Sequence, residues 1–185
     1  MKQFQGRVIT PGEVTAEAVV TTEGFNTLAS FQNALQFGDK EVKCGDQNNK
    51  DLYGKSMLGK ALCLPQTIGS TTGGLVLYCA CALEKNPACM LFSNPIDSLA
   101  AAGAVLADVW VDSVSMPVVD CLGDEFLNYV KDGMKITIHE NGIVGIMTGY
   151  EEKFHALGTP INRCEVVCKP FVLPAEEKKQ QEEEA

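Results

Sequence analysis

One stretch constrains the fold of this chain more than any other: residues 66–74, which read Gln-Thr-Ile-Gly-Ser-Thr-Thr-Gly-Gly. It holds three glycines and four hydroxyl residues, and each glycine costs roughly 1 kcal/mol in a helix or strand interior. Mostly apolar residues precede it at 60–65 and follow it at 75–83, which is typical of a turn between a strand and a helix. Glycine there lets the backbone approach a ligand, and the free N–H groups at a helix start suit an anion or a developing alkoxide. The alternative, that Ser70 and its neighbours are ordinary helix caps, stays open at this point.

The composition is that of one globular domain. The chain has 185 residues, of which 45% are hydrophobic and 21% are charged. Its formal charge of −9 makes nucleic acid and an anionic membrane surface poor partners. The sequence shows neither a basic leader followed by an apolar segment nor a long apolar run that would span a bilayer. We therefore expect a cytoplasmic protein that binds neither nucleic acid nor membrane.

Eight cysteines raise the question of a metal site or of disulfides. No Cys-x-x-Cys pair occurs, and the two histidines, His139 and His155, add no zinc pattern. His139 falls on the polar phase of a predicted strand, which favours a solvated histidine over a catalytic one. Reduced thiols that pack as small apolar groups are expected instead. Four of them lie within apolar runs: Cys63, Cys79, Cys81 and Cys89.

Short apolar runs that alternate with helical segments predict a parallel sheet built from βαβ units with right-handed crossovers. The expected strands are residues 5–9, 14–21, 61–64, 88–92, 109–111 and 117–119. The expected helices are residues 75–85, 100–104 (capped by Asp97 or Ser98) and 123–130. Residues 135–147 predict a hairpin, because Asn141-Gly142 suits a type I′ turn. The alanine-rich residues 99–107 indicate close helix packing rather than chemistry.

In two parts of the chain the apolar residues show neither helical nor strand spacing. Residues 24–53 are rich in turn residues, and we expect a long polar loop there, of the kind that usually has a function. Beyond Met147, residues 148–173 predict a C-terminal extension that packs on the domain of residues 1–147. Residues 174–185 form a charged tail that we expect to be disordered.

The order of these motifs resembles the small subunit, or swivel domain, of the aconitase X family. The resemblance covers residues 5–147, so it is much more specific than a lone Gly-Ser-Thr. The motifs that carry it are Gly6-Arg7-Val8-Ile9 with Gly12, Gly54-Lys55-Ser56-Met57-Leu58-Gly59-Lys60, Gly69-Ser70-Thr71-Thr72-Gly73, Pro87-Ala88, residues 101–107, Met116-Pro117-Val118-Val119, and Lys131-Asp132-Gly133-Met134-Lys135 with the hairpin after it. One departure is residues 30–38, where Ser30-Phe31 matches the family but its glycines and Asp-Pro are absent.

The resemblance implies an α/β fold: a swivelling β/β/α three-layer domain with a mainly parallel central sheet and additional antiparallel strands. It also implies a hydro-lyase, a dehydratase that is active only with a large subunit. That subunit would hold an iron–sulfur cluster and most substrate contacts, and the cluster would act as a Lewis acid on the departing hydroxyl. No metal is expected on this chain.

Transferred residue by residue, the family's catalytic serine is Ser70, which takes the proton from a small hydroxy acid. Its neighbours would offer backbone or hydroxyl groups to the substrate: Gly69, Thr71, Thr72 and Gly73. A free hydroxyl is a very poor base, so helix N–H groups, the helix dipole and a cation must stabilise the alkoxide. The nearest cations, Lys60 and Lys85, lie at the far ends of the adjoining elements. We expect the large subunit to supply the cation.

Two substrates are associated with the family, cis-3-hydroxy-L-proline and mevalonate 5-phosphate. A phosphate would favour Lys or Arg beside the Ser70 turn, and none is there, so the sequence favours the hydroxyproline. A phosphomevalonate dehydratase stays open as the alternative, because the large subunit could bind the phosphate. A second alternative is a non-catalytic swivelling domain that binds a partner, with Ser70 as a cap. A phosphoryl carrier is disfavoured, because that chemistry needs a histidine on the turn.

Overall fold

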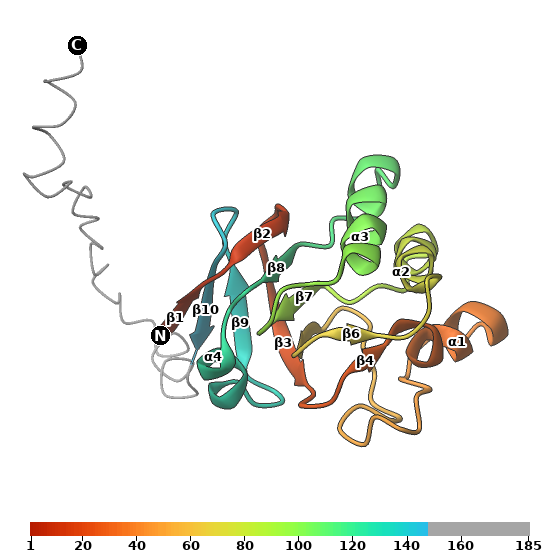
Figure 1. Cartoon of the computed structure of the whole chain (residues 1–185), viewed down its shortest axis with the longest axis horizontal. Coiled ribbons are helices and arrows are strands. Elements are labelled where there is room, and N and C mark those ends of the chain that lie inside the picture. The colour runs from red at the N-terminus through yellow and green to blue at the C-terminus, as the bar shows by residue number, and fades with distance from the viewer. Residues whose placement is uncertain (148–185) are drawn as a thin grey trace, which may run out of the picture. The chain divides into compact units, whose positions relative to one another are not determined.

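The computed structural model describes residues 1–147 (Figure 1). The predictions made for residues 148–173 and 174–185 lie outside these described residues. In chain order the elements are β1 (Lys2–Gln5), β2 (Arg7–Thr10), β3 (Val14–Val20), β4 (Phe25–Asn26), α1 (Thr27–Phe37), β5 (Ala61–Leu64), β6 (Thr67–Ile68), α2 (Gly73–Ala82), β7 (Cys89–Phe92), α3 (Ser98–Trp110), β8 (Val118–Asp120), α4 (Asp124–Tyr129), β9 (Lys135–Ile138) and β10 (Ile143–Met147). Among the described residues, no helix has the length and apolar character needed to cross a membrane.

Four parallel strands form the centre of the main sheet, in the order β3-β5-β7-β8. At one edge, β2 pairs with β8 in the antiparallel direction. β3 belongs to two parts of the sheet: its residues 18–20 pair with β5, whereas its residues 14–17 pair with β9 in the antiparallel direction. β10 and β1 follow β9, again antiparallel. The predicted combination of a parallel centre with additional antiparallel strands is thereby confirmed.

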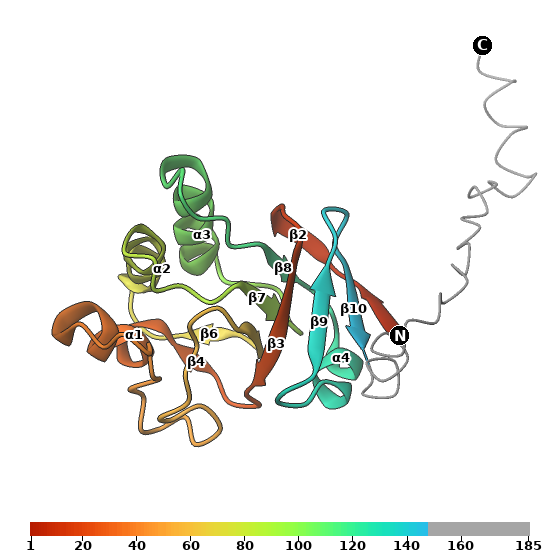
Figure 2. The same cartoon turned by 180° about the vertical axis from the view of Figure 1, so that it is seen from behind.

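The buried side chains form two cores on opposite faces of the central strands. Leu62 and Leu64 of β5 belong to the core that α1, α2 and α3 cover. Ala61 and Cys63 alternate with them along β5 and so point to the opposite face, where they belong to the other core with β9, β10 and α4. Figures 1 and 2 show the same separation, with α1 to α3 on one side of β7 and the β9–β10 hairpin with α4 on the other. These layers are the β/β/α arrangement that the family resemblance implied.

α2 and α3 contact each other backbone to backbone at two glycines. A Cβ added at Gly103 would lie 2.0 Å from the carbonyl oxygen of Gly74, and a Cβ added at Gly74 would lie 2.1 Å from that of Leu99. No other residue type fits at either position without separating the helices. Ala100 and Ala104 are buried beside this contact. The close packing predicted for the alanine-rich segment is therefore confirmed.

Helix α1 lies where a long polar loop was expected, so that prediction was wrong for this segment. Asn26 caps the helix, since its Oδ1 accepts a hydrogen bond from the Ala29 N–H at 3.2 Å. Gly38 ends it in the left-handed conformation, with φ +74°. The buried positions have helical spacing: Thr27, Ser30, Phe31 and Ala34. The rest of the segment, residues 39–53, contains turns rather than a helix or a strand, as expected.

Two predicted strands differ in the structure. Residues 109–111 form no strand: Val109 and Trp110 end α3, and Val111 is its C-cap. The valines and the tryptophan have a local preference for strand, but the packing of α3 on α2 outweighs it. The strand predicted at residues 5–9 is interrupted at Gly6, between β1 and β2, where a Cβ would lie 2.4 Å from the Val119 side chain.

Candidate active site

The Ser70 turn lies at the carboxyl ends of the parallel strands, which is where open α/β sheets bind their ligands. The chain leaves β5 and passes through the short strand β6 before it reaches Ser70. β6 pairs with β4, and the Phe25 N–H donates to the Gln66 carbonyl oxygen at 2.9 Å just before this pairing begins. α2 begins at Gly73, three residues after Ser70. The predicted order of strand, glycine-rich turn and helix is confirmed.

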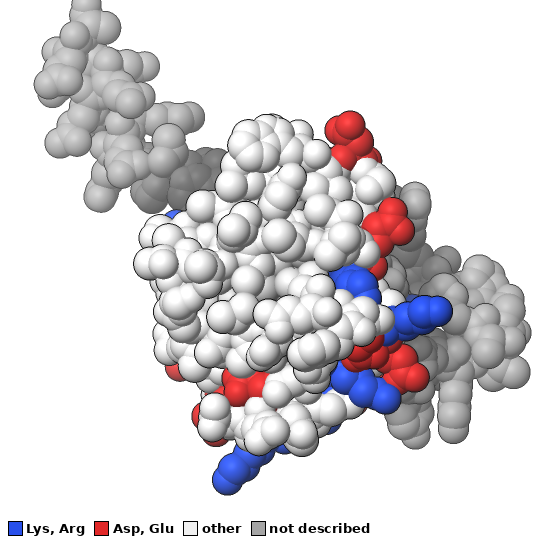
Figure 3. Space-filling model, turned by 90° about the vertical axis from the view of Figure 1, so that its right-hand side faces the viewer, with Lys and Arg blue, Asp and Glu red and all other residues white. Residues whose placement is uncertain are grey.

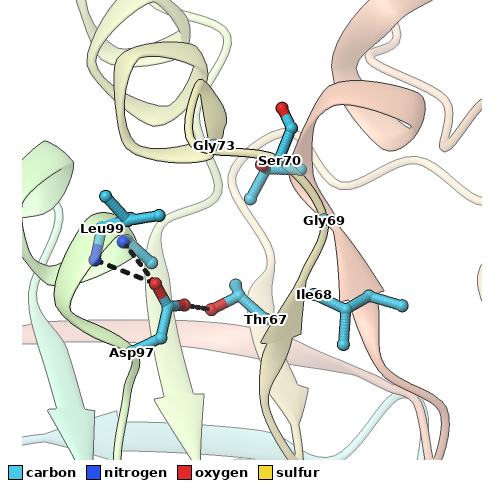
Figure 4. Close-up of a pocket in the computed structure, with 9 residues that line it drawn as sticks. Thr67, Ile68, Gly69, Ser70, Gly73, Asp97 and Leu99 are labelled. Carbon is cyan, nitrogen blue, oxygen red and sulfur yellow. Dashed lines mark hydrogen bonds between the residues drawn. The ribbon is translucent and has the colours of Figure 1, made fainter.

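A cavity of about 260 Å³ opens beside this turn (Figure 4). The first turns of three helices line it: Thr27 belongs to α1, Gly73 to α2, and Leu99 and Ala100 to α3. Because the amino end of a helix carries a partial positive charge, three such ends at one cavity favour an anion there. The rest of the lining comes from the turn itself and from the loop before α3: Thr67, Ile68, Gly69, Ser70 and Asp97.

Two of the three helix starts are already capped by the chain's own side chains. Asp97 Oδ1 accepts hydrogen bonds from the N–H groups of Leu99, at 2.9 Å, and Ala100, at 3.0 Å. Its other oxygen, Oδ2, accepts from the Thr67 hydroxyl, which ties the loop before α3 to the Ser70 turn (Figure 4). Asn26 caps α1 through its amide oxygen. The first turns of α1 and α3 therefore have acceptors of their own.

The start of α2 differs from the other two. Its N-cap residue is Thr72, whose side chain makes no capping hydrogen bond. The Thr72 hydroxyl lies instead 2.6 Å from the Ser70 hydroxyl, and the Gly73 N–H donates to the Ser70 carbonyl oxygen at 3.0 Å. Ser70 is thus not the N-cap residue of α2, although its Oγ accepts a long hydrogen bond of 3.4 Å from the Thr72 N–H just before the helix. The first turn of α2 has no side-chain acceptor from its cap, and Gly73 of that turn lines the cavity.

Glycines on both sides of Ser70 set its position. Gly69 has a φ of +122°, which side-chain-bearing residues rarely adopt. A Cβ at Gly73 would lie 2.9 Å from the Thr27 hydroxyl oxygen. Ser70 itself is exposed and lines the cavity. The Ser70 side chain is therefore accessible from outside, and its hydroxyl points away from Thr67 and Asp97 (Figure 4).

The structure brings together only part of the predicted site. Gly69, Ser70 and Gly73 line the cavity, whereas Thr71 and Thr72 are exposed and do not line it. Thr72 nevertheless contacts Ser70 through its hydroxyl.

Three cavity residues were not predicted as site residues. Asp97 was expected only as a possible helix cap, which it is, and its place in the cavity wall was missed. Thr67 lies within the stretch that drew attention, yet nothing in the sequence marked it apart from its neighbours. Thr27 gave no signal at all, because α1 was not predicted. The wall of the cavity is therefore assembled from parts of the chain that only the fold brings together.

Within the described lining of the cavity, Asp97 is the only charged residue. Lys60 contacts Glu17 instead, with 2.7 Å between Nζ and Oε2, and Lys85 donates to the Asp39 carbonyl oxygen at 2.6 Å. Both lysines are thus engaged away from the turn, as the sequence indicated. Within the described lining, the feature beside Ser70 that favours an anion is thus the start of α2 rather than a charged side chain.

The described residues do not fit an iron–sulfur cluster. Among residues 1–147, no group of three or more His, Cys, Asp or Glu side chains could hold a metal ion. Cys63, Cys81 and Cys89 are buried in the two cores, and burial raises the pKa of Cys81 to about 11. These thiols stay protonated at neutral pH and are poor ligands, as expected of thiols that pack as small apolar groups. His139 is half-buried and does not line the cavity.

The chain is similar in sequence to proteins of one known family. The family model of the aconitase X swivel domain matches residues 3–146. The phosphomevalonate dehydratase small subunit of Methanothermobacter thermautotrophicus is 30% identical over 132 residues, which cover 71% of this chain and 89% of that protein. The protein of the same name from Methanosarcina mazei is 27% identical over 139 residues, 74% of this chain and 85% of the relative.

A solved structure also shares the fold. It is the crystal structure of Thermococcus kodakaraensis aconitase X in its holo-form, with a TM-score of 0.66 and 26% sequence identity. The match covers 80% of this chain and 100% of that chain. Sequence and fold lead to the same result: the chain belongs to the aconitase X swivel domain family and is the small subunit of a dehydratase, a hydro-lyase, of that type.

Proposed function

We propose that this chain, together with a large subunit, dehydrates mevalonate 5-phosphate, and that Ser70 is the base. One observation carries the substrate: the relatives described above are phosphomevalonate dehydratase small subunits, and they align with most of this chain. The family match also includes the whole of residues 66–74. The cis-3-hydroxy-L-proline that the sequence favoured becomes the second candidate.

The geometry of the cavity answers the objection to a phosphorylated substrate. That objection was the absence of Lys and Arg beside the turn. Helix starts bind phosphate through their N–H groups and their dipoles without any cation. The first turn of α2 lacks a side-chain cap and lies at the cavity together with the starts of α1 and α3. This arrangement supports an anionic group of the substrate, phosphate or carboxylate, at the amino end of α2.

The local geometry also supports proton abstraction by Ser70. In the dehydration of a 3-hydroxy acid, a base takes a proton from the carbon next to the carboxylate. The hydroxyl on the following carbon leaves with its bonding electrons, and a carbon–carbon double bond forms. Ser70 Oγ takes such a proton only when it is close to an alkoxide. The Thr72 hydroxyl, 2.6 Å away, and the Thr72 N–H, 3.4 Å away, then act as donors to that oxygen, and the positive end of the α2 dipole lowers the cost of its charge.

The large subunit completes the site in this proposal. The described lining of the cavity offers no cation, and residues 1–147 offer no group of metal ligands. Both findings support a large subunit that contributes the cation, the iron–sulfur cluster and further substrate contacts. The chain alone is then inactive.

The test is a comparison of two substrates with the assembled protein. The chain is co-produced with a large aconitase X subunit under exclusion of oxygen, and each substrate is followed by the loss of one water in mass spectrometry. We expect turnover of mevalonate 5-phosphate by the complex and none by either subunit alone. Turnover of cis-3-hydroxy-L-proline instead would overturn the proposed substrate. A complex that forms but converts neither compound would favour the non-catalytic, partner-binding alternative.

A further inference from the structure

The helices on one side of the sheet are almost free of charge. α1 and α2 contain no charged residue, and α3 contains one, Asp108. In the whole chain about one residue in five is charged. Figure 3 shows this side of the molecule, with a broad white field and the acidic and basic side chains at its margin. Helices that cover a sheet normally present charged or polar residues to water, so this face needs an explanation.

α2 is apolar on the side that it turns to solvent. Val76, Leu77 and Ala80 are buried against the core. The residues on the opposite side are Leu75 and Leu83, which are 60% and 56% exposed, and Tyr78 and Cys79, which are half-buried. Leu75, Tyr78 and Cys79 are spaced i, i+3 and i+4 along α2, and Leu83, the C-cap residue just after the helix, extends this apolar surface. A helix that is apolar all round is normally buried all round.

α3 continues the apolar surface of α2 with large side chains. Leu99, Leu106 and Trp110 are 42%, 37% and 65% exposed. Trp110 is the only tryptophan of the chain. Its ring packs edge to face on the ring of Tyr78, with 6.3 Å between the ring centroids, and this contact joins α2 and α3 at the surface. Exposed aromatic residues with apolar neighbours are typical anchors of protein–protein interfaces.

From these observations we infer that the outer face of α2 and α3, defined by Leu75, Tyr78, Leu83, Leu99, Leu106 and Trp110, is the surface on which the large subunit docks. This inference rests on the proposed function, in which a large subunit completes the Ser70 site.

The position of the cavity selects this occupant over a second copy of the chain. Leu99 lines the cavity and also belongs to the docking face, and Leu75 lies in the first turn of α2, two residues after Gly73 of the lining. A subunit that closes the cavity over Ser70 therefore contacts the edge of the docking face, and the rest of the docking face continues directly from that contact. A second copy seated there would cover the same edge and keep the large subunit from the cavity. A nearly uncharged face also fits a permanent subunit contact better than a transient one.

Charge placed on this face tests the inference. In the complex with the large subunit, Trp110→Glu and, separately, Leu83→Glu are compared with Gln3→Glu, which adds the same charge at an exposed position of β1. Circular dichroism and thermal unfolding identify variants that keep the fold, and the two positions serve as independent probes. We expect the Kd for the large subunit to rise at least about 30-fold for either variant on the face and to stay unchanged for the control.

The outcomes separate this inference from the proposed function. An unchanged Kd for both folded variants, with the wild-type complex active, would overturn the docking face and leave the function in place. Wild-type complexes that form but convert neither substrate, with the Kd raised by Trp110→Glu, would keep the docking face and overturn the function. A chain that dimerises alone, becomes monomeric with Trp110→Glu and still binds the large subunit normally would assign the face to a second copy.

Discussion

At the level of single residues, Asp120 connects an ion pair at the end of β8 to the wall of the cavity. Its side chain is fully buried and accepts hydrogen bonds from Arg7 Nε at 2.9 Å and Nη2 at 2.6 Å. The same carboxylate accepts from the Ile96 N–H at 2.8 Å. Ile96 immediately precedes Asp97, which caps α3 and lines the cavity. Asp120 therefore helps to fix the loop that carries Asp97.

The titration of Asp120 gives a prediction on stability. Burial raises its pKa, but the hydrogen bonds from Arg7 and the Ile96 amide outweigh burial, and the pKa lies below its usual value. A carboxylate with a lowered pKa in the folded state stabilises the protein above its unfolded pKa of about 4, and this contribution is lost as the pH falls further. We expect Asp120→Asn to lower the free energy of unfolding by about 2 kcal/mol at neutral pH. We also expect the free energy of unfolding of this variant to fall less steeply as the pH is lowered.

Urea unfolding at several pH values between about 7 and 3 measures this effect. Asp112→Asn, at an exposed turn position, is the control and should change the free energy of unfolding by less than about 0.5 kcal/mol. The same acid sensitivity in Asp120→Asn and in the unmodified protein would show that this carboxylate is not the group responsible.

The sequence predicts Ser70 but not its surroundings, and the reason is physical. The evidence for Ser70 is local, because the glycines at 69 and 73 stand beside it and mark a turn. Thr27 and Asp97 lie far from it in the chain and reach the cavity only through the pairing of β4 with β6 and of β5 with β7. Local patterns carry no information on such pairings, so residues of this kind are found only in the fold.

At the level of elements, the contact between α2 and α3 places two helix starts at the same cavity. The backbones meet at Gly74, in the first turn of α2, and at Gly103, in the second turn of α3. A larger residue at either position would push the helices apart and move the cavity walls with them.

Gly103→Ala tests this contact. Its methyl group would lie 2.0 Å from a backbone oxygen that cannot rotate away, so we expect a loss of about 1–3 kcal/mol in the free energy of unfolding despite the better helix propensity of alanine. The control is Ala102→Ser at the preceding, exposed position. Chemical denaturation measures both, and a Gly103→Ala protein as stable as the original would mean that the helices separate without cost.

The elements also show where sequence patterns succeed. The strands β3, β5 and β7 and the hairpin of β9 and β10 have strong apolar periods and a recognisable turn, and they were predicted. α1 was missed, because its exposed positions are leucine, asparagine, glutamine and phenylalanine, which give little contrast with its buried side. Residues 109–111 prefer a strand locally, but the contact of α3 with α2 extends the helix through Trp110.

At the level of the whole molecule, the proposed function needs the described domain to share its active site with a large subunit. Three helix starts meet at a cavity whose described lining contains no cation, and two of those helices turn an apolar face outward from its edge. Both features are unfavourable for a protein that works alone: an anion in the cavity would find no side-chain counter-charge in the described lining, only the Asp97 carboxylate, and the apolar face is in water. Both are explained if a large subunit covers the cavity and the face together.

The most direct test of this account is the kcat of the complex with Ser70→Ala, measured with saturating substrate after assembly has been checked. We predict that kcat falls about 10³-fold or more while the affinity for the large subunit is unchanged, because the variant loses only the proton-accepting oxygen. Ser113→Ala, at an exposed serine away from the cavity lining, should retain full activity. A Ser70→Ala complex with a kcat within tenfold of the unmodified one would contradict the assignment of Ser70 as the base.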